Sequence, residues 1–331
     1  MFGLLFNYSY LVYKGIIMGK RIGIDVGGTN VKIALVSDKG KIIYSNSIPT
    51  RAEMGYEYTI NSMKDAIRDL LKETKMKPTD IEGMGFGFPG QIDCKKGVVR
   101  LAPNIPGWVN VPIASIMEKE FGIPTRVDND VRTAALGELN YGAGVGCENL
   151  VCITVGTGIG SGLVVNGKLV RGANNAAGEI GHIKLNYQGG PLCGCGDRGC
   201  LEAYASGPSI VALAEEYIRG GKSTKYRELA NPDITPYIVA VAAKEGDPVA
   251  RQIFKIMGEY IGMGLTSVVN LLNPEKIIIG GGVAEAGDIL FEPIKKTIAE
   301  RAMTIQREVE IVPAQLGNTA GVIGASLLIK S

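Results

Sequence analysis

Residues 21–36 read RIGIDVGGTNVKIALV, and this stretch decides the fold. Runs of apolar, largely β-branched residues lie on both sides of Gly27, Gly28 and Thr29, a pattern that predicts a strand, a tight turn and a returning strand. A third strand is expected at residues 42–45. The stretch therefore predicts a β-hairpin that opens an α/β domain.

The same pattern occurs again at residues 150–169, which read LVCITVGTGIGSGLVVNGKL. Val-Gly-Gly-Thr at 26–29 corresponds to Val-Gly-Thr-Gly at 155–158, and an Asn-Gly turn follows the second copy. A spacing of about 130 residues is too long for a solenoid repeat. The repeat therefore indicates two related α/β domains.

Helical spacing of apolar residues links these hairpins to the rest of the chain. It predicts helices over residues 60–71, ended by Pro78, over residues 253–272, ended by Asn273 and Pro274, and over residues 320–328. A buried strand is expected at residues 276–279, and it leads into Gly280, Gly281 and Gly282.

The composition excludes several classes of protein. The 331 residues include 46 Gly but no collagen-like period, and 46% of the residues are hydrophobic, so the chain is expected to be globular. The 35 Lys and Arg residues nearly balance the 33 Asp and Glu residues, which disfavours a nucleic-acid partner. The single histidine, His182, makes carboxylates the expected general bases.

The first 18 residues are apolar but are interrupted by Asn7 and Lys14. They have no basic leading segment and no small-residue cleavage site, and the run is short for a membrane helix. We therefore expect residues 1–17 to be an extension upstream of a true start at Met18. The alternative is an N-terminal arm packed on the body. We expect a cytoplasmic protein with no membrane partner.

The two glycine turns have the composition of phosphate-binding loops. Residues without a Cβ let backbone N–H groups approach phosphate oxygens, and a neighbouring threonine adds a hydroxyl donor. Glycine turns often only reverse the chain, but two matched turns that face each other could hold a triphosphate between them. Asp25, at the end of the first strand, would then orient Mg²⁺ through water.

Asn129 and Asp130 precede a predicted helix, where residues of these types commonly serve as N-caps. The rigid Pro/Gly-rich segments at residues 85–90 and 102–108 come earlier in the chain and are typical of loops that form sites. Both interpretations of Asn129 and Asp130, capping and function, remain open at this point.

His182, Cys193, Cys195 and Cys200 follow the spacing H-x10-C-x-C-x4-C. One His and three Cys complete a tetrahedral zinc site with no open position, which indicates a structural ion. Disulfides are the alternative, but three cysteines within eight residues leave one unpaired. Cys94, Cys147 and Cys152 show no ligand spacing and are interpreted as buried or free thiols.

Glu179 and Glu202 flank the zinc cluster. Ionised carboxylates only accept hydrogen bonds, so they suit recognition of several sugar hydroxyls, which donate. Either residue alone could be an ordinary exposed carboxylate. Their attachment to a loop stiffened by a metal favours a binding role.

These motifs resemble those of the ROK family of sugar kinases, and within it the bacterial-type glucokinases. The resemblance covers about residues 21–328 and rests on DVGGT at 25–29, Asn129-Asp130, VGTGIG at 155–160, GEIGH at 178–182 and CGCGDRGCLE at 193–202. It implies ATP-dependent phosphorylation of the glucose 6-hydroxyl, with Asp130 as the catalytic base.

The resemblance also implies the remaining site residues. Sugar contacts would come from Gly90, Asn104, Asn129, Asp130, Glu179, His182 and Glu202. Nucleotide contacts would come from Asp25, Gly27, Gly28, Thr29, Asn30, Lys32, Gly156, Thr157, Gly158, Gly280, Gly281 and Gly282. The cofactors implied are ATP, Mg²⁺ and structural Zn²⁺.

The fold implied is the two-domain actin-like ATPase (ribonuclease H-like) α/β fold, with a cleft between the domains. Residues 18–127 and 314–331 would form the small domain, and residues 128–313 the large domain with a zinc loop at 182–200. A homodimer or homotetramer is expected. The acceptor could instead be N-acetylglucosamine, N-acetylmannosamine, mannose or fructose. A family transcriptional regulator is disfavoured, because about 20 residues before the first strand are too few for a winged helix.

Overall fold

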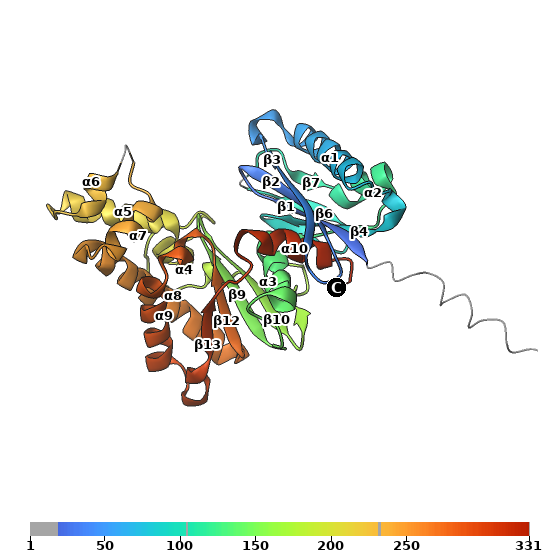
Figure 1. Ribbon diagram of the computed structural model, residues 1–331. Helices are drawn as coiled ribbons and strands as arrows, with labels where there is room; N and C mark the ends of the chain where they lie inside the picture. The colour runs from blue at the N-terminus through green and yellow to red at the C-terminus, as the bar shows by residue number, and fades with distance from the viewer. Residues whose placement is uncertain (1–18, 104, 231–232, 331) are drawn as a thin grey trace, which may run out of the picture.

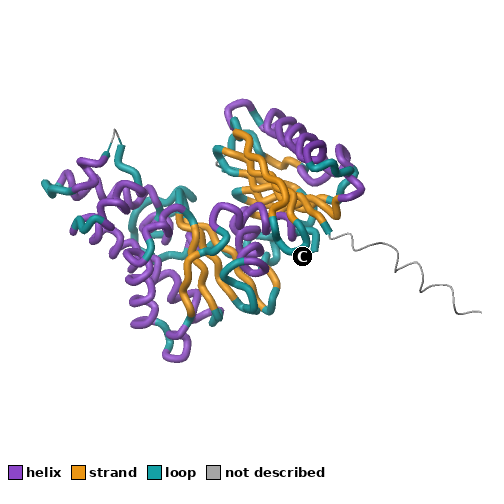
Figure 2. The backbone as a smooth tube through the Cα atoms, viewed as in Figure 1, coloured by secondary structure: helices purple, strands orange, loops and turns teal. Residues whose placement is uncertain are grey.

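A computed structural model describes residues 19–103, 105–230 and 233–330. Two five-stranded sheets lie on opposite sides of a pair of helices, α3 (Asp130–Tyr141) and α10 (Ala320–Leu327) (Figure 1). The remaining helices cover the outer faces of the two sheets, and the strands gather in two separate groups (Figure 2). Residues 1–17 and Asn104 lie outside the described residues.

The first sheet has the strand order β3-β2-β1-β4-β8. Its first three strands are antiparallel, and β1, β4 and β8 are parallel. The strands are β1 Lys20–Val26, β2 Asn30–Val36, β3 Ile42–Pro49, β4 Ile81–Phe88 and β8 Thr125–Asn129. A small antiparallel sheet lies between β4 and β8 in the sequence and consists of β5 Gln91–Asp93, β6 Val98–Leu101 and β7 Val109–Val111.

The second sheet repeats this topology in the order β11-β10-β9-β12-β13. Its strands are β9 Leu150–Val155, β10 Ile159–Val165, β11 Lys168–Leu169, β12 Lys276–Gly280 and β13 Glu310–Pro313. Again the first three are antiparallel and β9, β12 and β13 are parallel. The internal repeat predicted from the sequence is therefore confirmed.

The other helices are α1 Tyr56–Glu73, α2 Ile113–Phe121, α4 Leu201–Ala205, α5 Gly207–Arg219, α6 Lys225–Leu229, α7 Pro236–Lys244, α8 Pro248–Leu272 and α9 Asp288–Arg301. The long helix α8 ends at Leu272, as predicted, and its C-cap Asn273 takes the left-handed conformation. It begins at Pro248, earlier than the predicted residue 253. The prediction that Pro78 ends the first helix was wrong. That helix ends at Glu73, and Lys75 takes a positive φ of 54° before Pro78 is reached.

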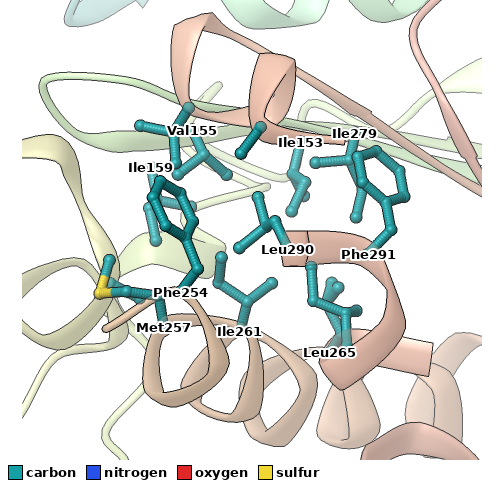
Figure 3. Close-up of a cluster of buried hydrophobic side chains, with 14 of the residues drawn as sticks. Ile153, Val155, Ile159, Phe254, Met257, Ile261, Leu265, Ile279, Leu290 and Phe291 are labelled. Carbon is teal, nitrogen blue, oxygen red and sulfur yellow. The ribbon is translucent and has the colours of Figure 1, made fainter. Parts of the chain in front are cut away.

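Alternation along the strands divides the side chains between two faces. In β1, Ile22, Ile24 and Val26 belong to the core beneath α1, whereas the alternate residues face α10. In β9, Ile153 and Val155 pack against α8 and α9, together with Phe254, Leu265 and Leu290 (Figure 3). The faces opposite these cores are those that meet α3 and α10.

Helices α3 and α10 touch through glycines. A methyl group at Gly324 would lie 1.6 Å from the carbonyl oxygen of Thr133, and one at Gly137 would lie 2.5 Å from that of Ala320. Gly23 of β1 is equally confined, because its methyl would lie 1.8 Å from the carbonyl oxygen of Val322. Backbone therefore packs directly on backbone at the centre of the molecule, between the two sheets.

Candidate active site

A cavity of about 480 Å³ lies beside the α3–α10 pair and receives residues from both sheets. Six residues predicted from the sequence line it: Asp25, Lys32, Asp130, Gly280, Gly281 and Gly282. Its wall also includes Thr154 of β9, Glu138 of α3, and Ala314, Gly317 and Asn318 from the segment that leads into α10. The structure thus brings the predicted base and the glycine run to one cavity.

Asp25 and Lys32 face each other across β1 and β2. Burial raises the pKa of the Asp25 carboxyl, and the charge of Lys32 acts in the opposite direction. Gly321 leaves room for this carboxyl, since a methyl there would lie 2.8 Å from its oxygen. A carboxylate in this position offers the oxygen ligand that Mg²⁺ prefers.

Asp130 is the first residue of α3, and its carboxylate accepts a hydrogen bond from the Val131 N–H at 2.9 Å. Asn129 caps the helix by accepting from the N–H groups of Val131 and Arg132, so the capping interpretation holds for Asn129 but not for Asp130. Burial raises the pKa of Asp130 to about 6, and the charge of Asp25 adds to the effect. A carboxylate with this pKa is ionised at neutral pH and remains basic enough to accept a proton.

The two predicted glycine turns close their hairpins but do not line the cavity. In the first, the Gly27 N–H donates to Asn30, and the Thr50 hydroxyl donates to the Gly27 carbonyl. In the second, the Gly156 carbonyl accepts from the Gly207 N–H at 2.7 Å. The turns adjoin the cavity through Asp25 and Thr154, which lie shortly before them in the chain.

The glycine run at 280–282 packs directly on the second hairpin. Gly281 has a φ of +87°, and a methyl group there would lie 2.4 Å from the carbonyl oxygen of Val155. Only glycine fits both the conformation and the space. Val155 immediately precedes Gly156, so the run and the second turn are neighbours.

The predicted zinc ligands converge. One ligand atom from each of His182, Cys193, Cys195 and Cys200 lies within 4.8 Å of all the others. The sulfurs of Cys195 and Cys200 are 3.7 Å apart, close to the separation of about 3.8 Å that a tetrahedral ion with bonds of about 2.3 Å imposes. All six cysteines are free of disulfides. The donor set therefore fits a closed structural zinc site.

Glu202 links this cluster to the second glycine turn. One carboxylate oxygen accepts from the Ile159 N–H at 2.9 Å, and the other lies 3.5 Å from the Cys193 sulfur. The Nδ1 atom of His182 lies 3.7 Å from the same sulfur. Nδ1 is therefore the ring nitrogen that faces the Cys193 sulfur.

A second cavity, of about 370 Å³, contains two more predicted residues, Gly90 and Glu179. Gly90 has a φ of +96°, and its carbonyl accepts from the Asn129 side chain at 3.4 Å. Arg132 and Asn175 also line this cavity. The predicted contact Asn104 lies outside the described residues.

A buried ionic network next to Asn129 was not predicted from the sequence. Asp128 is fully buried and accepts from Arg132 at 3.1 Å, from Arg171 at 2.7 Å and from the Cys94 thiol at 3.1 Å. Burial raises the pKa of Cys94 to about 12, so the thiol remains a donor. The spacing of Asp128 and Arg132, four residues apart across a helix start, is the one signal that could have revealed the pair.

Glu138 was also missed. It is fully buried on α3 and accepts three backbone N–H groups, from Ala143 at 2.8 Å, Gln315 at 3.1 Å and Leu316 at 2.8 Å. Its carboxylate has no cation partner among the described residues. Two of its three donors come from about 180 residues later in the chain, so no local pattern marks it.

The sequence profile of the ROK family matches residues 21–331. A glucokinase of Halalkalibacterium halodurans is 40% identical over 315 residues, which cover 93% of this chain and 94% of the relative. A xylose repressor of Caldicellulosiruptor bescii is 34% identical over 316 residues, which cover 95% of this chain and 79% of the repressor.

Among solved structures, this chain is similar to a ROK family glucokinase from Streptomyces griseus in complex with glucose and AMPPNP. The TM-score is 0.80 at 33% identity, and the match covers 94% of this chain and 99% of the other. The predicted actin-like fold is thereby confirmed. In the described part of the chain, no helix has the length and apolar character needed to cross a membrane.

Proposed function

The chain belongs to the ROK family, and from this premise we propose that it is an ATP-dependent glucokinase. It transfers the γ-phosphoryl group of ATP to the 6-hydroxyl of glucose and releases ADP and glucose 6-phosphate. The observation that carries the proposal is the position of Asp130. This carboxyl, with a pKa raised to about 6, lines one cavity with Asp25, Lys32 and the glycine run.

Asp130 accepts the proton of the sugar 6-hydroxyl as the oxygen attacks the phosphorus. The Val131 N–H holds the carboxylate in place, and the start of α3 favours its charge. Phosphoryl transfer depends mainly on positioning and charge neutralisation, and the base adds a smaller factor. Asp130 therefore both orients the acceptor oxygen and removes its proton.

On the nucleotide side, the two glycine turns, at residues 27–30 and 156–158, adjoin the cavity and would hold phosphates that extend from it. The Gly27 and Gly156 N–H groups are bonded within the turns, to Asn30 and Gly158, so the other backbone N–H groups of the turns would serve. Lys32 adds a positive charge. Gly280, Gly281 and Gly282 form the wall against the nucleotide. Asp25 would orient Mg²⁺ through water, and the bound ion would neutralise charge on the phosphates. The shared cavity of Asp25, Lys32 and the glycine run supports the roles of these residues.

On the sugar side, Gly90, Asn104, Asn129, Glu179, His182 and Glu202 bind the hydroxyls that do not react. His182 and the three cysteines would hold zinc, and the bound ion would fix the loop that carries Glu202. The hydrogen bond from Ile159 to Glu202 and the contact of Gly90 with Asn129 support this arrangement.

A coupled assay of ADP release tests the proposal with glucose, mannose, fructose, N-acetylglucosamine and N-acetylmannosamine as acceptors. We expect the highest kcat/KM with glucose, and lower activity after a chelator has removed zinc and the chelator itself has been removed. A higher kcat/KM with an N-acetylated hexose would reassign the acceptor. ADP release that no sugar stimulates would overturn the kinase assignment.

A further inference from the structure

We infer that α3 carries, besides the catalytic Asp130, two buried positioning residues that act on different substrates. Arg132 sets the loop that presents Glu179 to the sugar, and Glu138 sets the segment that forms part of the nucleotide wall. Neither residue is assigned a contact with a substrate. The inference rests on the proposed function, because it uses the same cavities.

The sugar side depends on Arg132. Its guanidinium is 4% exposed and donates through Nη1 to Asp128. Through Nη2 it donates to the carbonyls of Asn175 and Ala177, at 2.9 and 3.0 Å. Ala177 lies two residues before Glu179, and Arg132, Asn175 and Glu179 line the same cavity. Arg132 therefore fixes the backbone from which Glu179 extends.

The loop has a second attachment beyond Arg132. The Ser161 hydroxyl donates to the carbonyl of Gly178, the residue between Ala177 and Glu179. Gly178 has a φ of +91°, so the chain turns sharply at this point. Arg132 holds the residue before the turn, and Ser161 holds the turn residue itself. Together they fix the backbone position of Glu179.

The nucleotide side depends on Glu138. Its oxygens accept from Gln315 and Leu316, which lie between Ala314 and Gly317 on the cavity wall. The next residue, Asn318, accepts from Lys32 through its carbonyl at 3.1 Å. Glu138 thus holds the segment whose Asn318 carbonyl accepts a hydrogen bond from Lys32, on the opposite side of the cavity.

The two residues lie six positions apart on one helix, yet their partners are separate. Arg132 binds residues 128, 175 and 177, whereas Glu138 binds residues 143, 315 and 316. Their substitution should therefore affect different substrates. If the two residues had a merely structural role, their substitution would weaken the binding of both substrates together.

Two mild substitutions test this separation. Arg132→Lys keeps a positive charge beside Asp128, but one ammonium cannot reproduce the planar fork that reaches Asp128 and both carbonyls. Glu138→Gln keeps the shape but directs an NH₂ group toward a backbone N–H. Each variant loses hydrogen bonds in which one partner is charged, and such bonds are stronger than neutral ones. We expect the segment that is no longer held to lower the affinity for its substrate roughly tenfold.

We expect Arg132→Lys to raise the Kd and KM for glucose about tenfold and to leave the Kd for AMPPNP within about twofold. Glu138→Gln should raise the Kd for AMPPNP and the KM for ATP about tenfold and leave the Kd for glucose within about twofold. Isothermal titration calorimetry measures each Kd with one ligand alone, and melting curves confirm that the variants are folded.

Glu275→Gln is the matched control. Glu275 also accepts two backbone N–H groups, from Glu148 and Asn149 at 2.8 and 2.6 Å, but it lines neither cavity. It should change neither Kd. Variants that shift both ligands alike, or shift neither, would overturn the inference. A wild-type protein that binds AMPPNP but no glucose would instead contradict the proposed function.

Discussion

The two hairpins, β1–β2 and β9–β10, share the same strand pairing but carry different side chains next to their turns. In the first, Asp25 pairs with Lys32 one step before the turn, and in the second Thr154 pairs with Gly160 at the corresponding place. Four residues separate Val26 from Val31, but only three separate Val155 from Ile159. Both Asp25 and Thr154 line the cavity. The two repeats therefore place their turns beside one cavity, and of the two hairpins only the first contributes charged residues to the cavity wall.

Packing accounts for part of this difference. A methyl group at Gly160 would lie 2.5 Å from the Val131 side chain, so α3 approaches too closely for any larger residue there. The first hairpin has space for Lys32, which reaches Asn318 instead. The second half contributes rigid support, through the zinc cluster, Glu202 and the core of Figure 3.

The largest effect is expected at Asp130, which lines the cavity beside the charged residues of the first hairpin. We expect Asp130→Asn to lower kcat by about 10²- to 10⁴-fold, because general base catalysis contributes about that factor. Glucose binding should remain, since Asn keeps the size and an acceptor oxygen. ADP release measures kcat and calorimetry measures glucose binding. Turnover near that of the wild type would remove Asp130 from its role.

The support given by the second half can be tested at the zinc cluster. Cys200→Ser removes a fully buried ligand, so we expect loss of bound zinc, a lower melting temperature and weaker glucose binding by at least about tenfold. Cys147→Ser is the control, because Cys147 is a free thiol outside the cluster. Elemental analysis gives the zinc content. Full zinc occupancy in the Cys200 variant would refute the assigned ligand set.

The pH dependence of kcat/KM tests the ionisation of Asp130. Asp130 must be ionised to accept a proton, and its pKa is raised to about 6. We therefore expect kcat/KM to fall by about tenfold per pH unit below pH 6 and to level off above it. A profile of kcat/KM between pH 5 and 8 measures this limb. An unchanged rate at pH 5 would be inconsistent with Asp130 as the base.

A smaller effect should follow where the glycine run meets the second hairpin. Gly281→Ala forces a methyl group toward Val155 at a positive φ, at a cost of about 1–3 kcal/mol. Gly282→Ala is the stability control, since nothing lies within 4 Å of its added methyl. Denaturant unfolding compares the two variants. Equal stability would show that the close packing at Gly281 is not required.

The smallest effect concerns the cost of keeping Asp130 charged. Its pKa is higher in the folded protein than the ordinary value of 3.8, so the folded state holds its proton more tightly. That contribution to stability is present at low pH and is lost as the pH rises through about 6. Asp130→Asn should therefore raise the melting temperature by a few degrees at pH 7.5, and less at pH 4.5. A lower melting temperature at pH 7.5 would contradict this.

Local patterns predicted the hairpins, the long helix and the zinc ligands, because each depends on residues close together in the sequence. The network around Asp128 and the three bonds to Glu138 depend on residues that are far apart, such as Arg171 and Leu316. The position of Glu202 at the Ile159 turn likewise follows from tertiary packing. A single sequence gives no measure of such distances, so these positioning contacts required the structure.

The backbone contact between α3 and α10 bears on motion. Interlocking side chains resist the sliding of packed helices, and at Gly137 and Gly324 backbone lies against backbone with no such side chain between them. We therefore expect the two sheets to rotate about this crossing with little repacking when substrates enter, as in shear movements of packed helices. Small-angle X-ray scattering would detect the rotation as a smaller radius of gyration with glucose than without it. An unchanged radius would indicate a rigid crossing.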